Sequence, residues 1–390
     1  MRRRLIIVGV ATILLIGGYL FGAYLRNRGE GGVYVIYRAI LPDAASFESI
    51  TGSTARALDA SGNLIAYIGF GEGTGYGGTM LVGAVVDAQG RLLEPVVIRH
   101  NETPAWLVMV TGRFNRYVGI PVDGMITPGH DLDTITGATL THRAVSDAVR
   151  ETAHSIAITE FGLNPPQAAA MQWQFGHQEI IILVLFIIGI VIAQHKALIK
   201  FRFPFLLLTT VILGFRLNRA LSISQVSSLF LGFFPPLRTS IIFYIVLAGV
   251  FLPIIFLGKN IYCTYVCPFC GLQEVLNKVS GKDIPLGKTR KWFSMLRNAL
   301  LFITLMGVII TANVNIFFYE PFGIVFGRNT RVDFYLWVIL FFSLGISFIF
   351  RKFWCVALCP TGAFIDLVRR LRGDLLRLIR GAGTENEEVA

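Results

Sequence analysis

The stretch RRRLIIVGVATILLIGGYLFGA, residues 2–23, places three arginines before nineteen residues that carry no charge. A helix needs about 20 apolar residues to cross the hydrocarbon core of a bilayer, so residues 5–23 are expected to form a membrane helix. A signal peptide would begin in the same way, but no clean small-x-small cleavage site follows, which favours a retained anchor. Both alternatives export the chain that follows.

Further apolar runs continue the pattern toward the C-terminus. Only 15% of the 390 residues are charged, against about 25% in a soluble protein, and 54% are hydrophobic. The second, third and fifth of six runs are short and need their flanks to complete a span. We expect a membrane α-helical protein with six transmembrane helices, the five after the anchor centred on residues 180–193, 203–217, 241–257, 300–313 and 334–350.

The net charge of +11 is explained by topology. With the N-terminus in the cytoplasm, the segments expected inside are 1–4, 194–202, 258–299 and 351–390, and they hold 20 of the 35 lysines and arginines. The long segment 24–178 lies outside and carries no lysine and more acidic than basic residues. This distribution follows the positive-inside rule. It predicts a multi-pass protein of the plasma (cell inner) membrane, in contact with lipid and without a nucleic-acid partner.

The exported segment reads as one compact α/β (α+β) domain. A helix is expected around residues 43–50, and strands are expected at 63–70, 79–87 and 95–99, separated by glycine-rich turns. A second helix is predicted from about residue 139 to about residue 158, because apolar residues recur there at helical spacing. Its apolar face is formed by Ala144, Val145, Ala148, Val149 and Ile156.

The run Asp133-Thr-Ile-Thr136-Gly137-Ala138-Thr139 stands at the start of that second helix. Small residues on a tight turn let backbone N–H groups approach a phosphate, and the helix dipole favours its negative charge. A threonine hydroxyl there could itself be joined to a phosphate. Taken alone, these residues favour an Asp/Thr cap on an ordinary helix.

This run resembles the flavinylation motif Asp-x-x-Ser/Thr-Gly-Ala-Thr/Ser of the FMN-binding domains in Rnf/Nqr and NosR-like electron-transfer families. All five motif positions match: Asp133, Thr136, Gly137, Ala138 and Thr139. The resemblance implies FMN attached covalently, through a phosphoester, to Thr139 by a flavin transferase. Residues 75–78 and 100–104 resemble the same domain, which implies that His100, Glu102 and Thr103 line the flavin pocket.

The five cysteines all follow apolar runs expected to end in the cytoplasm, where disulfides are rare. Four of them form two copies of Cys-x3-Cys-Pro, Cys263/Cys267 and Cys355/Cys359. In a helix, residues i and i+4 share one face, and four thiolates together could hold a 4Fe–4S or 2Fe–2S cluster. Zinc binding and simple burial of thiols are alternatives, and Cys270 is a spare or a helper.

The two cysteine segments resemble each other and the membrane modules of NosR-like, NapH-like and reductive-dehalogenase-associated (RdhC-like) proteins. The expected order is an anchor (1–24), the FMN domain (25–165), a five-helix module (166–363) and a basic helix on the inner membrane surface followed by an acidic tail (364–390). Typical NosR proteins add a ferredoxin-like region with further cysteines. This chain has none to supply it, so the RdhC-like architecture fits better.

These resemblances imply transmembrane electron transfer rather than a complete enzyme. Electrons would enter from quinol or a cytoplasmic donor and leave through the flavin to an exported respiratory reductase. A redox sensor or maturation factor of the NosR type is the alternative. No haem is expected, because none of the six histidines lies inside an apolar run.

Overall fold

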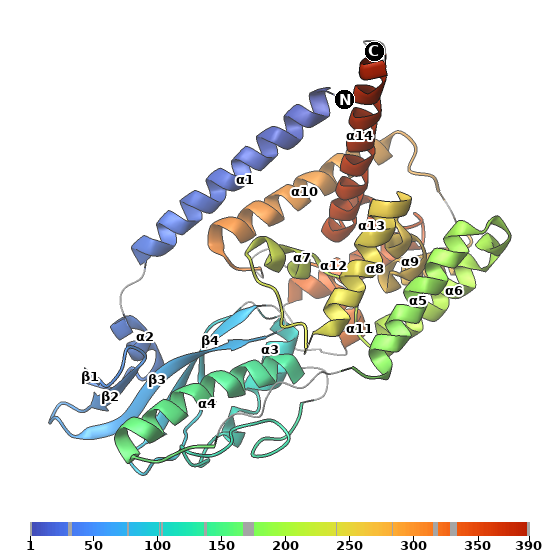
Figure 1. Ribbon diagram of the computed structural model, residues 1–390. Coiled ribbons are helices and arrows are strands. Elements are labelled where there is room, and N and C mark those ends of the chain that lie inside the picture. The colour runs from blue at the N-terminus through green and yellow to red at the C-terminus, as the bar shows by residue number, and fades with distance from the viewer. Residues whose placement is uncertain are drawn as a thin grey trace.

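The computed structural model describes residues 2–29, 33–75, 78–100, 102, 104–135, 139–166, 175–238, 240–282, 284–314, 319–327 and 334–387. A sheet-containing domain lies at one end of the molecule, and both termini lie at the other end (Figure 1). Helices fill the space between them. Thr136, Gly137, Ala138 and Thr103 are not among the described residues, and the side chain of Thr139 is not described either.

The domain is built on a five-stranded antiparallel sheet whose strands lie in sequence order. β4 alternates between two cores, because successive strand residues point to opposite faces. Val82, Ala84 and Val86 pack under helix α4, whereas Val85 joins the core under helix α2. The strands are β1 (Ser46–Ser49), β2 (Thr54–Leu58), β3 (Leu64–Thr74), β4 (Thr79–Asp87) and β5 (Val96–Arg99).

Helix α4 (Thr139–Phe161) lies directly on the backbone of β3. A Cβ atom on Gly71 or Gly73 would come within 2.3 Å of Ala148 O or 1.8 Å of Ala144 O. The glycines therefore permit the close approach that places the first turn of α4 over the sheet. The predicted apolar face of this helix is confirmed, since all five of its residues, Ala144, Val145, Ala148, Val149 and Ile156, are fully buried.

The helix expected around residues 43–50 is wrong. Helix α2 spans Val33–Ile40, and residues 46–49 form edge strand β1. α2 carries Tyr37 and Ile40 into the second face of the sheet, where both are buried. A shorter helix, α3 (Pro104–Thr111), and the turn η1 (Phe114–Arg116) follow β5.

Helices form at all six apolar runs. Three of them, His177–Gln194, Lys196–Arg216 and Thr289–Thr311, are long and apolar enough to cross a membrane, and shorter apolar helices cover Gly9–Tyr24, Ile241–Leu257 and Phe334–Ser347. The N-terminal run lies within α1 (Arg2–Gly29). The third run is continuous through three elements, η2 (Lys196–Phe201), α6 (Arg202–Thr209) and η3 (Thr210–Arg216). The remaining runs form α5 (His177–Gln194), α8 (Ile241–Leu257), α10 (Thr289–Thr311) and α12 (Phe334–Ser347).

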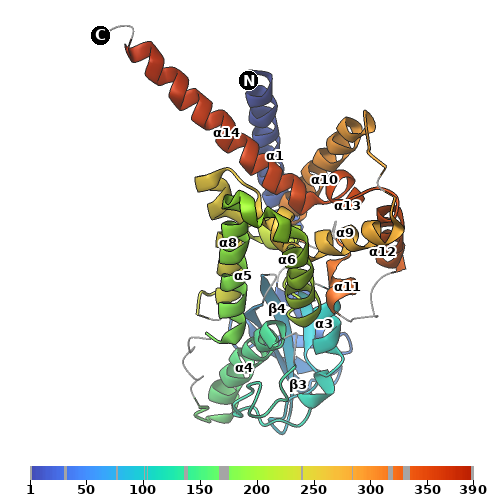
Figure 2. The same cartoon turned by 90° about the vertical axis from the view of Figure 1, so that its right-hand side faces the viewer.

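Short helices complete the helical part. They are α7 (Ile223–Phe230), η4 (Tyr262–Val266), α9 (Pro268–Ser280), α11 (Phe322–Gly327) and α13 (Phe353–Ala357). The last helix, α14 (Pro360–Glu387), begins inside the bundle and rises diagonally out of it (Figure 2). Its first turns are buried, with Ala363 and Ile365 at 0% exposure. The helix expected to start at 364 and lie on the membrane surface is thus the outer part of a longer, packed helix.

Candidate functional site

The candidate flavin-binding residues lie between the end of β3 and the starts of α3 and α4. Glu102, just before α3, is fully buried and accepts a hydrogen bond from Thr141 Oγ1 at 2.5 Å. Its carboxylate also lies against Gly75 at the end of β3, where a Cβ atom would stand 2.2 Å from Glu102 Oε1. Glu102 therefore ties the glycine turn to the first turn of α4, the turn that begins at Thr139.

Two histidines of this domain have buried ring nitrogens, His100 just after β5 and His142 in the first turn of α4. Their Nδ1 atoms make no hydrogen bond to the described part of the chain. Burial lowers the pKa of both imidazoles, and Arg113 lowers that of His142 further. Buried, unpartnered polar atoms are available to a ligand, and the start of α4 offers backbone N–H groups to a phosphate.

Asp133, another residue predicted to bind the flavin, lies at the surface. Asp133 is exposed and pairs at 4.0 Å with Arg116, so its carboxylate faces solvent. Thr141 and His142 were not predicted as site residues, although both lie within one turn of Thr139. Because Thr141 and His142 follow Thr139 by two and three residues, a helix that starts at 139 would have predicted them as neighbours of the attachment site.

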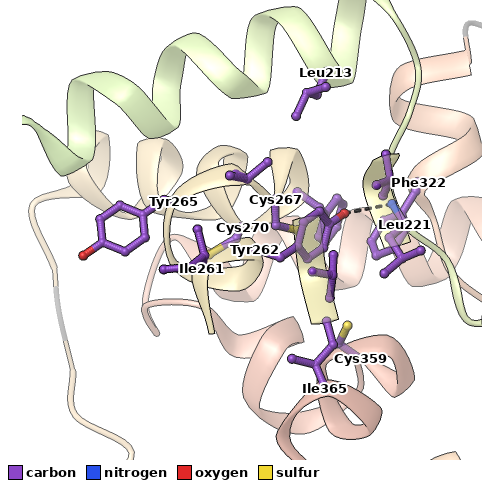
Figure 3. Close-up of a cluster of buried hydrophobic side chains, with 14 of the residues drawn as sticks. Leu213, Leu221, Ile261, Tyr262, Tyr265, Cys267, Cys270, Phe322, Cys359 and Ile365 are labelled. Atoms are coloured by element: carbon purple, nitrogen blue, oxygen red, sulfur yellow. Dashed lines mark hydrogen bonds between the residues drawn. The ribbon is translucent and has the colours of Figure 1, made fainter. Parts of the chain in front are cut away.

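All five cysteines line a single cavity of about 290 Å³. Cys263 lies in η4 and Cys270 in α9, whereas Cys355 lies in α13. Cys267 caps α9, and Cys359 stands between α13 and α14. Figure 3 shows Cys267 and Cys270 beside Tyr262, with Cys359 on the neighbouring segment.

The expectation that each cysteine pair shares one helical face is wrong. The helix ends at each Cys-Pro step, because a proline lacks the N–H that would continue it, and Pro268 and Pro360 each begin a new helix. Cys267 is extended, with φ −61° and ψ 117°. The breaks direct five thiols from two chain segments, 263–270 and 355–359, into one cavity.

The thiols are spread around this cavity. Among the described residues, no three cysteine, histidine or acidic side chains gather closely enough to hold a single metal ion. In an iron–sulfur cluster, by contrast, each thiolate can bind a different iron atom. A cavity lined by five buried or half-buried thiols therefore has the donor set that a cluster requires.

Residues 273 and 274 of α9 hold the second cysteine segment against the first. Gln273 Nε2 donates to Cys355 Sγ at 3.3 Å, and Gln273 Oε1 accepts from Trp354 N at 3.0 Å. The neighbouring Glu274, 1% exposed, pairs with Lys352 at 2.6 Å and with Arg202 and Arg351. Gly362 N also donates to Cys359 Sγ. Such N–H···S contacts orient thiolates and adjust the potential of a bound cluster.

The start of α14 packs over the cysteine segments. Cys263 and Cys267 follow the end of α8, and Cys355 and Cys359 follow the end of α12. Farther along α14, Arg372 donates to the carbonyls of Ile255 and Phe256, at the end of α8. The cysteine cavity therefore lies where these helices end, with residues of α14 in its lining.

Aromatic side chains pack between this cavity and helix α11. Phe322 of α11 lines the cavity, and α11 contacts α3 of the domain. Phe322 lies 5.2 Å from Phe269 and 6.5 Å from Trp354, measured between ring centres, and Trp354 lies 5.9 Å from Tyr319. These four residues, Phe269, Tyr319, Phe322 and Trp354, are called the aromatic cluster below.

Two family models match the chain. An FMN-binding domain matches residues 75–154, and a 4Fe-4S binding domain matches residues 239–287 and 332–379. The first match covers Gly75, Glu102 and Thr139, and the second covers both cysteine segments. The FMN and iron–sulfur assignments are thereby confirmed at the level of the domain.

Relatives combine the same parts. Protein NirI of Paracoccus denitrificans is 26% identical over 286 residues, which is 65% of this chain and 41% of NirI. A component of the ion-translocating oxidoreductase complex of Methanosarcina acetivorans is 30% identical over 139 residues, or 32% of this chain and 74% of that component. Regulatory protein NosR of Stutzerimonas stutzeri is 24% identical over 196 residues, 46% of this chain and 26% of NosR.

The chain spans less than half the length of NirI and NosR. The flavin-side match extends over most of the ion-translocating complex component, and the helical part carries the matching cluster domain. The chain belongs to the NosR-like and Rnf-type FMN-binding membrane proteins, and its helical part carries a 4Fe-4S binding domain.

Proposed function

We propose that the protein carries electrons across the cell inner membrane between a cluster held by Cys263, Cys267, Cys355 and Cys359 and an FMN joined to Thr139. The flavin domain lies outside the cell membrane, six helices span the bilayer, and the N-terminus lies in the cytoplasm. Quinol or a cytoplasmic donor supplies the electrons. A flavin transferase attaches the FMN, and an exported reductase accepts the electrons.

One observation carries this proposal. Both Cys-Pro segments line one cavity, and the aromatic cluster joins that cavity to helix α11, which contacts the flavin domain. A flavin accepts one or two electrons, so it can pass the single electrons of a cluster to a two-electron acceptor.

The chain's own residues have distinct roles in this proposal. The N-terminus of α4 holds the phosphate, and Glu102 fixes the turn at Gly75 beside it. Gln273 and the Gly362 amide orient the thiolates of Cys355 and Cys359. The buried apolar residues around both places exclude water.

The flavin assignment is tested by in-gel fluorescence of the denatured protein after co-expression with a flavin transferase. We expect a fluorescent band from the wild type and none from Thr139→Ala, while Thr134→Ala, five residues away in the exposed loop, keeps the band. A fluorescent Thr139→Ala band would move the attachment point elsewhere.

The cluster assignment is tested by electron paramagnetic resonance of the reduced protein, purified without oxygen. The iron–sulfur signal is expected in the wild type and lost in Cys263→Ser, Cys267→Ser, Cys355→Ser and Cys359→Ser, but retained in Cys270→Ser. Loss of the signal in Cys270→Ser with retention in one of the others would reassign the ligand set.

A sensor or maturation role is the second candidate, supported by the similarity to a protein named Regulatory protein NosR. The electron conduit and the sensor differ in the rate at which electrons pass through the flavin. Reduction of the bound FMN from a membrane or cytoplasmic donor at turnover rate supports the conduit, whereas slow equilibration without net flow supports the sensor.

A further inference from the structure

A second cavity, of about 260 Å³, opens between α10 and α14 beside the cysteine cavity. Four of its lining residues are arginines and one is an aspartate, so the lining carries a clear excess of positive charge. α10 contributes Arg290, Ser294 and Arg297, α13 contributes Val356, and α14 contributes Asp366, Arg369 and Arg370. We call these residues the arginine pocket.

The single acid of the arginine pocket is already engaged. Asp366 pairs with Arg297 at 2.8 Å and with Arg369 at 3.5 Å. In the described part of the chain no carboxylate pairs with Arg290 or Arg370. Two of the four guanidinium groups thus lack a carboxylate partner in the described residues, and the cavity is large enough for a small anion.

Arg297 distinguishes this pocket from ordinary basic residues at a membrane surface. Lysines and arginines near lipid headgroups are normally exposed, but Arg297 is only 9% exposed and its Nε is buried without a partner in the described residues. Its Nη1 donates to Cys355 O at 2.8 Å. One wall of the pocket is therefore a buried cation in contact with the cysteine segment.

The geometry points to a phosphate group as the ligand of the arginine pocket. We propose that the pocket binds a phosphate-bearing anion, either the headgroup of an anionic phospholipid or a soluble phosphate. Arginine forks match the oxygens of a phosphate and bind them in pairs, and basic pockets between membrane helices take anionic headgroups. A folded acidic protein fits less well, because its surface could not reach Arg297.

The location agrees with either source of phosphate. Arg369 and Arg370 lie within one turn of Arg372, which contacts the end of α8, on the side of the molecule away from the flavin domain. In the proposed topology this is the depth of the inner headgroups. The pocket also shares Arg290, Arg297, Val356, Asp366 and Arg369 with the cysteine cavity, so a bound anion would stand beside a cluster there.

The test uses the full-length protein, purified and reconstituted in nanodiscs. One set of discs contains phosphatidylcholine alone, with or without inorganic phosphate, and the other contains phosphatidylcholine with cardiolipin. The variant is Arg369→Gln with Arg370→Gln. The matched control is Lys291→Gln with Arg377→Gln, which removes the same charge from exposed positions outside the pocket on the same two helices.

We expect one of the two probes to raise the apparent melting temperature of the wild type, with native mass spectrometry detecting the bound species. The pocket variant should bind that probe at least about tenfold more weakly, as befits the loss of two charge-assisted contacts, and the control should bind within about twofold of the wild type. A response to cardiolipin alone assigns a lipid headgroup, and a response to phosphate in neutral discs assigns a soluble ligand.

Equal binding by the pocket variant and the control would overturn the proposal, as would the absence of binding to the wild type. Loss of reduction by an acidic donor protein in the pocket variant, without any phosphate binding, would likewise replace it by a protein-docking surface. Arg290→Gln alone serves as a second variant should the double change impair folding. Because the flavin band on Thr139 is read separately, failure of this proposal is distinguishable from failure of the proposed function.

Discussion

Among single residues, Gly75 leaves no room for a larger side chain. A methyl group there would stand 2.2 Å from Glu102 Oε1, and the buried carboxylate cannot move without breaking its bond to Thr141. Gly75→Ala is expected to destabilise the domain by about 1–3 kcal/mol, the usual cost of overpacking, and to weaken flavin attachment. Thermal unfolding and in-gel flavin fluorescence measure both effects.

Gly52→Ala is the matched control, since nothing lies within 4 Å of a Cβ at that position. It should change neither measurement. Equal loss in both variants would show that the Gly75 contact is not specific to the pocket.

The buried histidines predict a pH dependence for the flavin domain. Burial lowers the pKa of His100 and His142 in the folded state, whereas an unfolded histidine titrates near 6.5. The unfolded state therefore binds more protons as the pH falls below about 6.5, and each histidine then removes up to about 1.4 kcal/mol of stability per pH unit. Above that pH the contribution is fully present.

Flavin fluorescence during heating, from about pH 5 to pH 8, reports this domain. The melting temperature should fall on the acid side for the wild type and fall less steeply for His142→Gln, which cannot be protonated. An identical pH profile for both would remove His142 from this account.

At the scale of elements, α9 holds the two cysteine segments together through Glu274. Three cations, Arg202, Arg351 and Lys352, share this one carboxylate, which is 1% exposed. Glu274→Gln leaves three partly exposed positive charges without their carboxylate, at a cost below the roughly 3–5 kcal/mol of a fully buried pair. We expect a clearly lower apparent melting temperature and a smaller iron–sulfur signal per protein.

Glu48→Gln is the control for the Glu274 prediction. It makes the same chemical change in an exposed pair, 3.9 Å from Arg56, where the loss should stay below about 1 kcal/mol. A Glu274→Gln protein as stable as Glu48→Gln would mean that α9 does not depend on this ion network.

The elements that could be predicted are those with strong periodicity. α4 was predicted because its apolar residues recur at helical spacing, and β4 because it is an apolar, valine-rich run that follows a glycine-rich turn. β1 and β2 were missed, since Ser46–Ser49 and Thr54–Leu58 are short and rich in residues of weak strand preference. α2 was missed because it is stabilised by packing of Tyr37 and Ile40 on the sheet, a tertiary effect.

The site was predicted in part for the same reason. The sequence motifs indicated Thr139 and the paired cysteines, and the repeated spacing of the cysteines indicated a shared role. The convergence of Glu102, Thr141 and Gly75 depends on the crossing of α4 over β3, which no local pattern contains. The burial of the Cys359 side chain depends on α14, which begins at Pro360 inside the bundle.

For the whole molecule, the proposed orientation makes a direct prediction. The segments expected inside hold 20 of 35 basic residues, so the C-terminus should be cytoplasmic and residues 33–166 exported. Green fluorescent protein fused after residue 390 should fluoresce, and alkaline phosphatase inserted after residue 166 should be active. The reverse pattern in the two reporters would invert the orientation.

The enclosure of the cysteine cavity has a consequence for biogenesis. Its walls come from segments spread from Leu221 to Arg369, and the start of α14 is the last of these segments in the sequence. A preassembled cluster is bulky and charged, so we expect its delivery before that helix packs into place. The flavin, by contrast, is joined to a domain on the other side of the membrane in the proposed topology. The protein would then mature in two compartments, with cluster insertion tied to the packing of α14 and flavin attachment free to follow export.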